Sequence, residues 1–148
     1  MKLIKPFRAL RPTRELASQV ASPPYDVVNR AEAKKIARGN PYSFLHINKP
    51  DIDVGEGVDA HDPLVYQTGR GNLDEFINSG ILVKDESDSY YLYRQIMGDH
   101  KQLGLVAVAS VDAYDDGSIK IHEFTRPDKE EDRVRHMVEL GEIGRAHV

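Results

Sequence analysis

Helix signals are clear in the first third of the chain. Asn29 followed by Glu32 forms a capping-box pattern, which predicts a helix over residues 30–38. Thr13 is the expected cap of a shorter helix that runs through Val20. The pattern of polar and apolar positions therefore predicts two helices before residue 40.

An apolar stripe at helical spacing occupies residues 64–77. It comprises Leu64, Val65, Leu73, Phe76 and Ile77. Gly69 and Gly71 fall inside the stripe, where each costs about 1 kcal/mol relative to alanine. The pattern still predicts a helix that ends toward Gly80.

Two stretches between these helices show no periodicity. Residues 22–26 contain two prolines, which remove backbone donors and predict a rigid extended turn that presents Tyr25 and Asp26. Residues 48–62 are polar and rich in Asp and Gly. We expect them to form a long, mobile loop that could cover a site.

Short runs rich in apolar and β-branched residues predict the strands. They are an opening strand around Pro6 and residues 43–47, 90–97, 103–111 and 118–122. Residues 90–97 and 103–111 are expected to pair as an antiparallel hairpin, with the nearly continuous apolar run 103–111 in a central position. Strands and helices without an internal repeat predict a mixed α+β fold, with a mainly antiparallel sheet and flanking helices.

Composition narrows the kinds of partner. The chain has 148 residues, of which 40% are hydrophobic, which suits one domain over residues 1–141. Its net charge of −4 means that DNA binding would need a local basic patch. Such a patch, with a solvated surface as the alternative, comprises Lys2, Lys5, Arg8, Arg11 and Arg14. The lack of cysteine and of a long apolar run predicts a cytoplasmic protein without a membrane partner.

The C-terminal residues have a different character. Residues 142–148 resemble the translation of a sequencing-library adapter that runs into a stop codon. We expect them to be a non-native tail and the chain to be the N-terminal part of a longer protein. A frayed polar terminus is the alternative.

The richest chemistry lies at a predicted strand-to-helix junction, where residues 122–133 read His-Glu-Phe-Thr-Arg-Pro-Asp-Lys-Glu-Glu-Asp-Arg. Lys129 and Arg133 share a helix face, where an anion such as phosphate would relieve their repulsion. His122 and Glu123 point to opposite faces of a strand, so one of them is expected to enter the same site. The sequence supports a structural role and a catalytic role for His122 equally.

The helix after this junction has its own pattern. Thr125 is its expected cap, and residues four apart form the expected pairs Glu131 with Arg135 and Asp132 with His136. Its predicted buried stripe comprises Val134, Met137 and Val138.

Standard metal and nucleotide motifs are absent from the sequence. The junction is not H-E-x-x-H, and the histidines show no ligand spacing, so no metal site is expected. The histidines compared, five of the six in the chain, are His46, His61, His100, His122 and His136. There is also no P-loop, no G-x-G-x-x-G and no G-x-S-x-G.

Five segments resemble the bacterial and archaeal domain of unknown function family 1015. They are residues 7–12, 21–28, 40–47, 90–95 and 122–133. The most specific are Pro-Pro-Tyr-Asp in the second segment and the pattern His-Glu-x-Thr-x-x-x-Lys-x-x-Asp-Arg in the last. The resemblance covers almost the whole chain, and family members look longer than this chain.

The family resemblance implies a kind of site. Its members are often labelled ParB-like, and distant ParB/sulfiredoxin-type relatives include nucleotide-hydrolysing partition proteins and a kinase for free serine. This implies a ParB/sulfiredoxin-like fold and a site for a nucleotide or a phosphorylated small molecule, with ATP or ADP and Mg²⁺ as the cofactor. Two functions stay open: a small-molecule phosphotransferase or nucleotide hydrolase, and a non-catalytic ParB-like regulatory or DNA-associated module.

The family pattern also implies site residues. The implied catalytic residues are His122, Glu123 and Asp26. The implied phosphate- or substrate-binding residues are Arg11, Tyr25, Asn40, Thr125, Lys129, Asp132 and Arg133. Lys129 and Arg133 are the expected phosphate contacts, with His122 or Glu123 as general base. The enzyme hypothesis predicts that His122, Lys129 and Arg133 converge with Tyr25 and Asp26 around one pocket.

Overall fold

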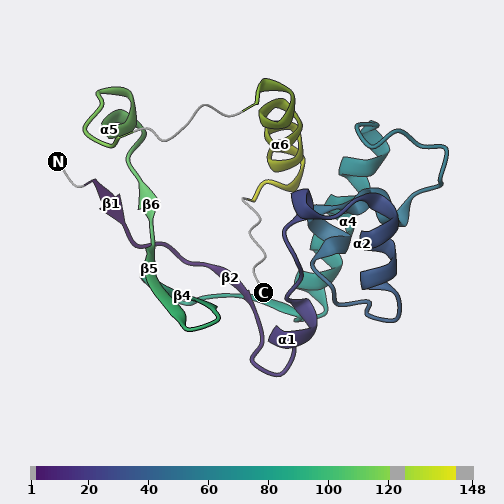
Figure 1. The fold of residues 1–148 in the computed structure, drawn as a ribbon, viewed down its shortest axis with the longest axis horizontal. Helices are drawn as coiled ribbons and strands as arrows, with labels where there is room; N and C mark the ends of the chain where they lie inside the picture. Colours follow the sequence, from purple (N-terminus) through teal and green to yellow (C-terminus); the bar gives the residue numbers. More distant parts are fainter. Residues whose placement is uncertain (1–2, 121–125, 143–148) are drawn as a thin grey trace. The chain divides into compact units, whose positions relative to one another are not determined.

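The computed structural model describes residues 3–120 and 126–142. Within these ranges the chain divides into two compact units (Figure 1). Unit 1 consists of residues 3–11 and 84–120, and unit 2 of residues 12–83 and 126–142. The chain therefore leaves unit 2 after residue 83 and returns to it with its last helix.

Unit 1 contains short antiparallel strand pairs and one short helix. Strands β1 (Ile4–Lys5) and β6 (Val108–Ala109) pair, as do β4 (Tyr91–Met97) and β5 (His100–Val106), and α5 (Val111–Asp115) follows. Met97 lies opposite His100, so Gly98 and Asp99 form a two-residue turn. Gly98 has φ 58°, as a glycine at the first position of a type II′ turn requires. The predicted hairpin is confirmed, with a tighter turn than expected.

Tyr91 ties the N-terminal segment of unit 1 to the hairpin. Its hydroxyl accepts a hydrogen bond from the Ala9 backbone N–H at 2.9 Å, and its single proton faces two acceptors, the Asp85 carboxylate at 2.5 Å and the Phe7 carbonyl at 3.0 Å. Its ring packs against that of Phe7, with 5.2 Å between the ring centroids. Because unit 1 has little core, this contact is one of its main long-range links.

Two predicted features of unit 1 are wrong. The run 103–111 is not central: β5 belongs to a two-stranded sheet, and Leu103 is 64% exposed. An apolar run shows that the side chains of a strand can be buried, but it does not determine how many other strands pair with that strand. Residues 118–120 form no strand, because Gly117 with φ 76° and an Asp116 carboxylate that accepts from the Ser118 N–H turn the chain instead.

Unit 2 is mainly helical. Its elements are α1 (Ala17–Val20), η1 (Tyr25–Val27), α2 (Arg30–Ala37), α3 (Leu45–Asn48), η2 (Pro50–Asp53), α4 (Pro63–Asn78) and α6 (Pro127–Leu140). Helices α3 and α6 pack against α4, and α2 packs against η2. A core cluster of Ala33, Ala37, Leu45 and Ile52 joins α2, α3 and η2. Strands β2 (Leu10–Pro12) and β3 (Leu82–Lys84) lie at the two points where the chain passes from one unit to the other.

Local signals gave the two main helices of residues 12–83 correctly. Both hydrogen bonds of the capping box before α2 are present, from the Glu32 N–H to Asn29 Oδ1 and from the Asn29 N–H to Glu32 Oε2, each at 2.9 Å. Helix α4 begins after Asp62, whose carboxylate accepts from the Leu64 N–H at 2.8 Å. Both helices form where the chain supplies partners for their free N–H groups.

Three predictions for the shorter elements of unit 2 are wrong. Thr13 does not cap α1, because Leu16 is the residue before the helix and the Thr13 carbonyl accepts from its N–H. The turn at residues 22–26 is only partly extended, since Tyr25 begins a 3₁₀ helix. Residues 45–47 belong to helix α3 and residues 43–44 form no strand, because a short apolar run fits either a helix or a strand and the packing of α3 against α4 decides.

The segment 48–62 begins with regular structure, because Asn48 ends α3 and Pro50–Asp53 form η2. Pro50, Asp51 and Ile52 are buried in η2. The Arg30 guanidinium donates to the carbonyls of Val54, Gly55 and Val58 at 2.8–3.1 Å. The Arg30 side chain therefore holds the backbone of this loop against α2. The amino-acid composition of the loop could not predict this contact.

The buried face of α6 differs from the predicted one. Val134 and Val138 are 48% and 76% exposed, whereas His136 and Leu140 are buried. The predicted apolar stripe is therefore wrong, because the face of α6 that packs inward carries a histidine. The helix ends at Gly141, which has φ 67°.

Taken by class, the chain is a mixed α+β protein with small antiparallel sheets and flanking helices. Within the part of the chain that the structure describes, no helix combines the length and the apolar character needed to cross a membrane. The ParB/sulfiredoxin-like fold stays a prediction.

The two glycines of α4 are expected to respond oppositely to alanine. A Cβ on Gly71 would meet no atom within 4 Å, so Gly71→Ala should stabilise the protein by about 0.5–1 kcal/mol through helix propensity. A Cβ on Gly69 would lie 3.0 Å from Pro50 Cγ and 3.2 Å from the Ile47 carbonyl oxygen. Gly69→Ala should therefore destabilise. Urea unfolding measures both, and equal stabilisation by the two variants would contradict the close packing of α4 on α3 and η2.

Candidate functional site

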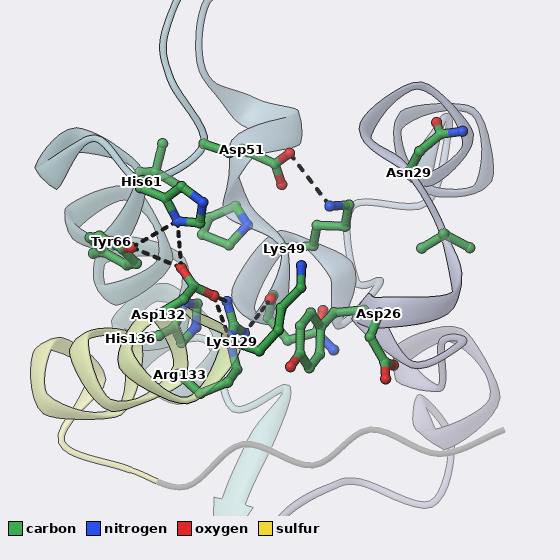
Figure 2. Close-up of a pocket in the computed structure, with 16 residues that line it drawn as sticks. Asp26, Asn29, Lys49, Asp51, His61, Tyr66, Lys129, Asp132, Arg133 and His136 are labelled. Carbon is green, nitrogen blue, oxygen red and sulfur yellow. Dashed lines mark hydrogen bonds and ion pairs between the residues drawn. The ribbon is translucent and has the colours of Figure 1, made fainter. Parts of the chain in front are cut away.

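A cavity of about 300 Å³ lies in unit 2 (Figure 2). Its walls come from η1, the start of α2, residues 48–51, residues 60–61, the start of α4 and one face of α6. The first four of these wall segments precede α4, whereas α6 follows all of unit 1 in the sequence. The return of α6 to unit 2 therefore completes the cavity.

Asp132 is the centre of a hydrogen-bond network in the cavity wall. Its Oδ1 accepts from His61 Nδ1 at 2.9 Å and from the Tyr66 hydroxyl at 2.8 Å. Its Oδ2 accepts from Arg133 Nε at 2.9 Å and also from Nη2 of the same guanidinium. The carboxylate side chain is only 11% exposed, so these partners replace most of its contact with water.

The network fixes the charge state of its members. Burial alone would raise the pKa of Asp132, but the hydrogen bonds from Arg133 and Tyr66 and the charge of Arg133 outweigh it and lower that pKa. Burial, followed by the hydrogen bond to Asp132, raises the pKa of Tyr66 to about 12. At neutral pH Asp132 is therefore ionised and the Tyr66 hydroxyl is a donor.

An ionised Asp132 also orients His61. A carboxylate only accepts hydrogen bonds, so the proton of a neutral His61 ring lies on Nδ1 and the lone pair on Nε2. A carboxylate that holds an imidazole in this tautomer prepares Nε2 to take a proton from a substrate. The pair can therefore act as an oriented general base.

Arg133 connects three parts of the wall. Its Nη1 donates to the Asn48 carbonyl at 3.3 Å, and its guanidinium carbon lies 4.0 Å from the centre of the Tyr25 ring. These two contacts hold η1 and the end of α3 against α6. Burial raises the pKa of Tyr25, although the charge of Arg133 acts in the opposite direction.

The two lysines of the cavity have different surroundings. Lys49 Nζ lies 3.6 Å from Asp51 Oδ2, and both side chains are largely buried. Among the residues that the structure describes, the Lys129 ammonium has no hydrogen-bond or ion-pair partner. Figure 2 shows Lys129 extending from α6 toward the middle of the labelled side chains, while the carboxylate of Asp26 points away from it. Lys129 is therefore the cation in this wall that is available to an anion.

His136 is buried in the same wall as a neutral ring. Burial, and then the charge of Arg133, lowers its pKa to about 4. The ring is 5% exposed and meets the Tyr66 ring edge to face, with centroids 6.1 Å apart. Its Nε2 has no hydrogen-bond partner, and neither does the buried Oδ1 of Asn48.

The structure brings together half of the residues that the family pattern implied. Those that line the cavity are Tyr25, Asp26, Lys129, Asp132 and Arg133. Arg11 lies in unit 1, where Nη2 and Nε donate to the carboxylate of Asp85 at 2.7 and 3.0 Å. Asn40 is outside the cavity wall, where its side chain donates to the Gln19 carbonyl and accepts from the Tyr42 N–H. His122, Glu123 and Thr125 lie outside the described residues.

Sequence reasoning missed several polar residues of the wall, among them Asn48, Lys49, Asp51, His61, Tyr66 and His136. The predicted pair of Asp132 with His136 is wrong, because Asp132 pairs with His61 instead. The predicted pair of Glu131 with Arg135 is confirmed. The position of His61 in a loop expected to cover a site was the available signal, but its partner lies 71 residues away in the sequence.

Metal ligands do not gather in the described part of the chain. Among residues 3–120 and 126–142, no group of three or more His, Cys, Asp or Glu side chains is placed to hold a metal ion.

The fold and site define an α+β protein with a charged pocket closed by a helix from late in the sequence. The chain belongs to the DUF1015 family, described as a protein of unknown function, whose model matches residues 4–141. Neither the curated proteins nor the solved structures include a match to this chain.

Proposed function

We propose that the pocket of unit 2 binds a small phosphate compound and that the protein is a small-molecule phosphotransferase or nucleotide hydrolase of ParB/sulfiredoxin type. The observation that carries the proposal is the unpaired Lys129 ammonium, which lines the same cavity as the Asp132–His61 pair. A cation without a carboxylate partner favours an anionic ligand, and an oriented imidazole can remove a proton from a hydroxyl or a water.

A cation and an oriented base are groups that suit phosphoryl transfer. The reaction depends mainly on positioning and on stabilising the charge of the transferred group, while a base orients and deprotonates the nucleophile. Lys129 would contact the phosphate, and Asp132 would keep His61 in the tautomer that accepts the proton. Arg133 would serve chiefly to hold the wall together, because its guanidinium already contacts Asp132 and the Asn48 carbonyl.

The size of the cavity limits the ligand. About 300 Å³ is at the lower end of the roughly 300–1,000 Å³ typical of ligand pockets. A small phosphate ester fits this volume, whereas ATP or ADP would extend beyond the wall described. Mg²⁺ usually binds through nucleotide phosphates with one or two carboxylates, and Asp26 lines the cavity without an ion-pair partner among the residues that the structure describes.

Loss of the Lys129 ammonium is expected to abolish stabilisation by phosphate compounds. A ligand at about 100 times its dissociation constant should stabilise the wild-type chain by about 2.7 kcal/mol, seen as a rise in melting temperature. The ligands to test are inorganic phosphate, AMP, ADP and ATP, the nucleotides with and without Mg²⁺. Lys129→Ala should remove the shift, because no other unpaired cation is present in the described wall.

The matched control is Lys34→Ala, which removes an exposed lysine of α2 outside the cavity wall. This variant should keep the full ligand-induced shift. No shift of the wild-type protein with any of the four compounds would contradict the proposed function, as would an equal loss in both variants.

The alternative is a non-catalytic ParB-like regulatory or DNA-associated module. It depends on the basic residues near the N-terminus, of which Arg11 has its charge offset by the bidentate contact with Asp85. DNA binding by the remaining residues would weaken steeply as salt is raised. We prefer the small-molecule function because no described contact favours the alternative.

A further inference from the structure

His46 faces a hydrogen-bond acceptor with each of its two ring nitrogens. Nδ1 lies 2.9 and 2.8 Å from the two carboxylate oxygens of Asp53, and Nε2 lies 3.2 Å from the backbone carbonyl oxygen of Asn40. Neither a carboxylate nor a carbonyl can donate, and a neutral imidazole carries only one N–H. Both contacts are therefore satisfied together only when the ring carries a second proton and hence a positive charge.

Asp53 stabilises the charged form of this ring. The side chains of His46 and Asp53 are only 20% and 28% exposed, so water screens their attraction incompletely. The hydrogen bond with Asp53 raises the pKa of His46 and outweighs the partial burial of the ring, which acts in the opposite direction. The ring therefore keeps its second proton to a higher pH than an ordinary histidine does.

Other charged side chains come from the elements that pack against α3, which are α4, η2 and α2. Arg70 and Asp74 of α4 pair with each other at 3.0 Å, and Asp51 of η2 lies 3.6 Å from Lys49. The remaining charged residues of these elements are Glu75 of α4 and Arg30, Glu32, Lys34 and Lys35 of α2. Of the residues that the structure describes, Asp53 is the charged group that shifts the pKa of the His46 ring.

The pair of His46 and Asp53 closes a short loop of chain that belongs to the cavity wall. His46 lies in α3 and Asp53 ends η2, and the residues between them that line the cavity are 48–51. Asn72 of α4 connects both ends of this loop, because its Nδ2 donates to the His46 carbonyl at 2.7 Å and to the Asp53 carboxylate at 2.9 Å. The ring and Asn72 thus hold the two ends of one wall segment together.

We propose that His46 is a proton-dependent clamp on this wall of the cavity: the doubly protonated ring holds residues 48–51 in place, and loss of its second proton releases them. In a neutral ring, one nitrogen lone pair faces either the Asp53 carboxylate or the Asn40 carbonyl, so one contact becomes repulsive. The stabilisation is fully present below pH 6.5 and is lost as pH rises through the raised pKa of His46. This role of His46 does not depend on the identity of the ligand, so it survives a failure of the phosphate-binding test.

NMR measurements on the full chain test the proton and the wall separately. The ¹⁵N shifts of the His46 ring should show the second proton on most molecules at pH 6.5. As pH rises through the midpoint of this titration, the backbone N–H groups of Asn48, Lys49 and Ile52 should lose protection against hydrogen exchange by at least about tenfold. The N–H of Ala33, which is bonded within α2, is the internal reference and should keep its protection.

Asp53→Asn tests whether the charge of the pair controls the wall. The carboxamide keeps the size of the side chain but lacks the charge, so the ring should lose its second proton at a lower pH, and the loss of protection should move with it. Asp74→Asn is the matched control, because Asp74 pairs with Arg70 and its side chain is 47% exposed. This variant should leave both transitions at the wild-type pH.

Three results would overturn the clamp. The first is a His46 ring that is mostly neutral at pH 6.5 in the wild-type protein. The second is protection of Asn48, Lys49 and Ile52 that stays constant while the ring titrates. The third is a loss of protection that stays at the wild-type pH in Asp53→Asn although the titration of the ring has moved. The first two are measured on the wild-type protein, so they decide the question even where Asp53→Asn fails to fold.

Discussion

Asp132→Ala is expected to lower the free energy of unfolding by about 2–4 kcal/mol, the largest effect of any single substitution considered for this protein. The variant removes the acceptor of the hydrogen bonds from His61, Tyr66 and Arg133. Arg133 is only 26% exposed in its side chain, so its charge would remain largely buried without a carboxylate. The lower end of the range allows for the water that still reaches the guanidinium.

The neighbouring acid provides the control. Glu131 is in the same helix and pairs with Arg135, but both side chains are more than half exposed. Glu131→Ala should therefore cost no more than about 0.5 kcal/mol. Urea unfolding of the two variants at pH 7 makes the comparison, and equal losses would mean that the Asp132 network does not hold α6 in unit 2.

Acidification is expected to destabilise the protein through His136, and this is the second large effect. The pKa of the His136 ring is about 4 in the folded protein and about 6.5 in the unfolded chain. As pH falls below 6.5, the unfolded chain binds a proton that the folded protein does not, until pH reaches about 4. One pKa unit corresponds to about 1.4 kcal/mol, so the total loss from this group is about 3 kcal/mol.

Other groups titrate nearby and must be separated from His136. The hydrogen bond with Asp53 raises the pKa of His46, so the contribution of His46 is present below pH 6.5 and is lost as pH rises through the raised value. The pKa of Asp132 is lowered, so its contribution is present above 3.8 and is lost as pH falls through the lowered value. Neither change gives a loss between pH 6.5 and 4 of the kind expected from His136.

The difference between wild-type protein and His136→Phe isolates the contribution of the ring. Unfolding free energies of both proteins are measured by urea titration from pH 7 to pH 4. The difference in stability should move in favour of His136→Phe by about 3 kcal/mol over this range. A difference that stays constant with pH would show that the folded and unfolded states bind the proton equally.

Local signals in the sequence were sufficient for several elements. The capping box of Asn29 and Glu32 forms as predicted, and the stripe within residues 64–77 forms α4. The hairpin of β4 and β5 was also predictable. In each case neighbouring residues supply the hydrogen bonds or the turn, so the information lies within a few positions of the element.

Other elements depended on contacts between distant residues. Residues 45–47 form part of helix α3 rather than a strand because α4 packs against this helix, and Gly69 leaves room for that approach. The buried face of α6 was misassigned because Val134 and Val138 are the more apolar residues but point to solvent. Apolar character predicts that a residue can be buried, whereas the partner helix determines which face is buried.

The sequence by itself determined the α+β class, the family, the main helices and the concentration of charge at Lys129, Asp132 and Arg133. Only the tertiary structure decided that Asp132 holds His61, that Arg133 covers Tyr25, and that His136 is buried without a partner for Nε2. The physical reason is that charge and hydrogen-bonding capacity belong to each residue, whereas pairing, burial and pKa depend on atoms contributed by α4, α6 and the loop between η2 and α4.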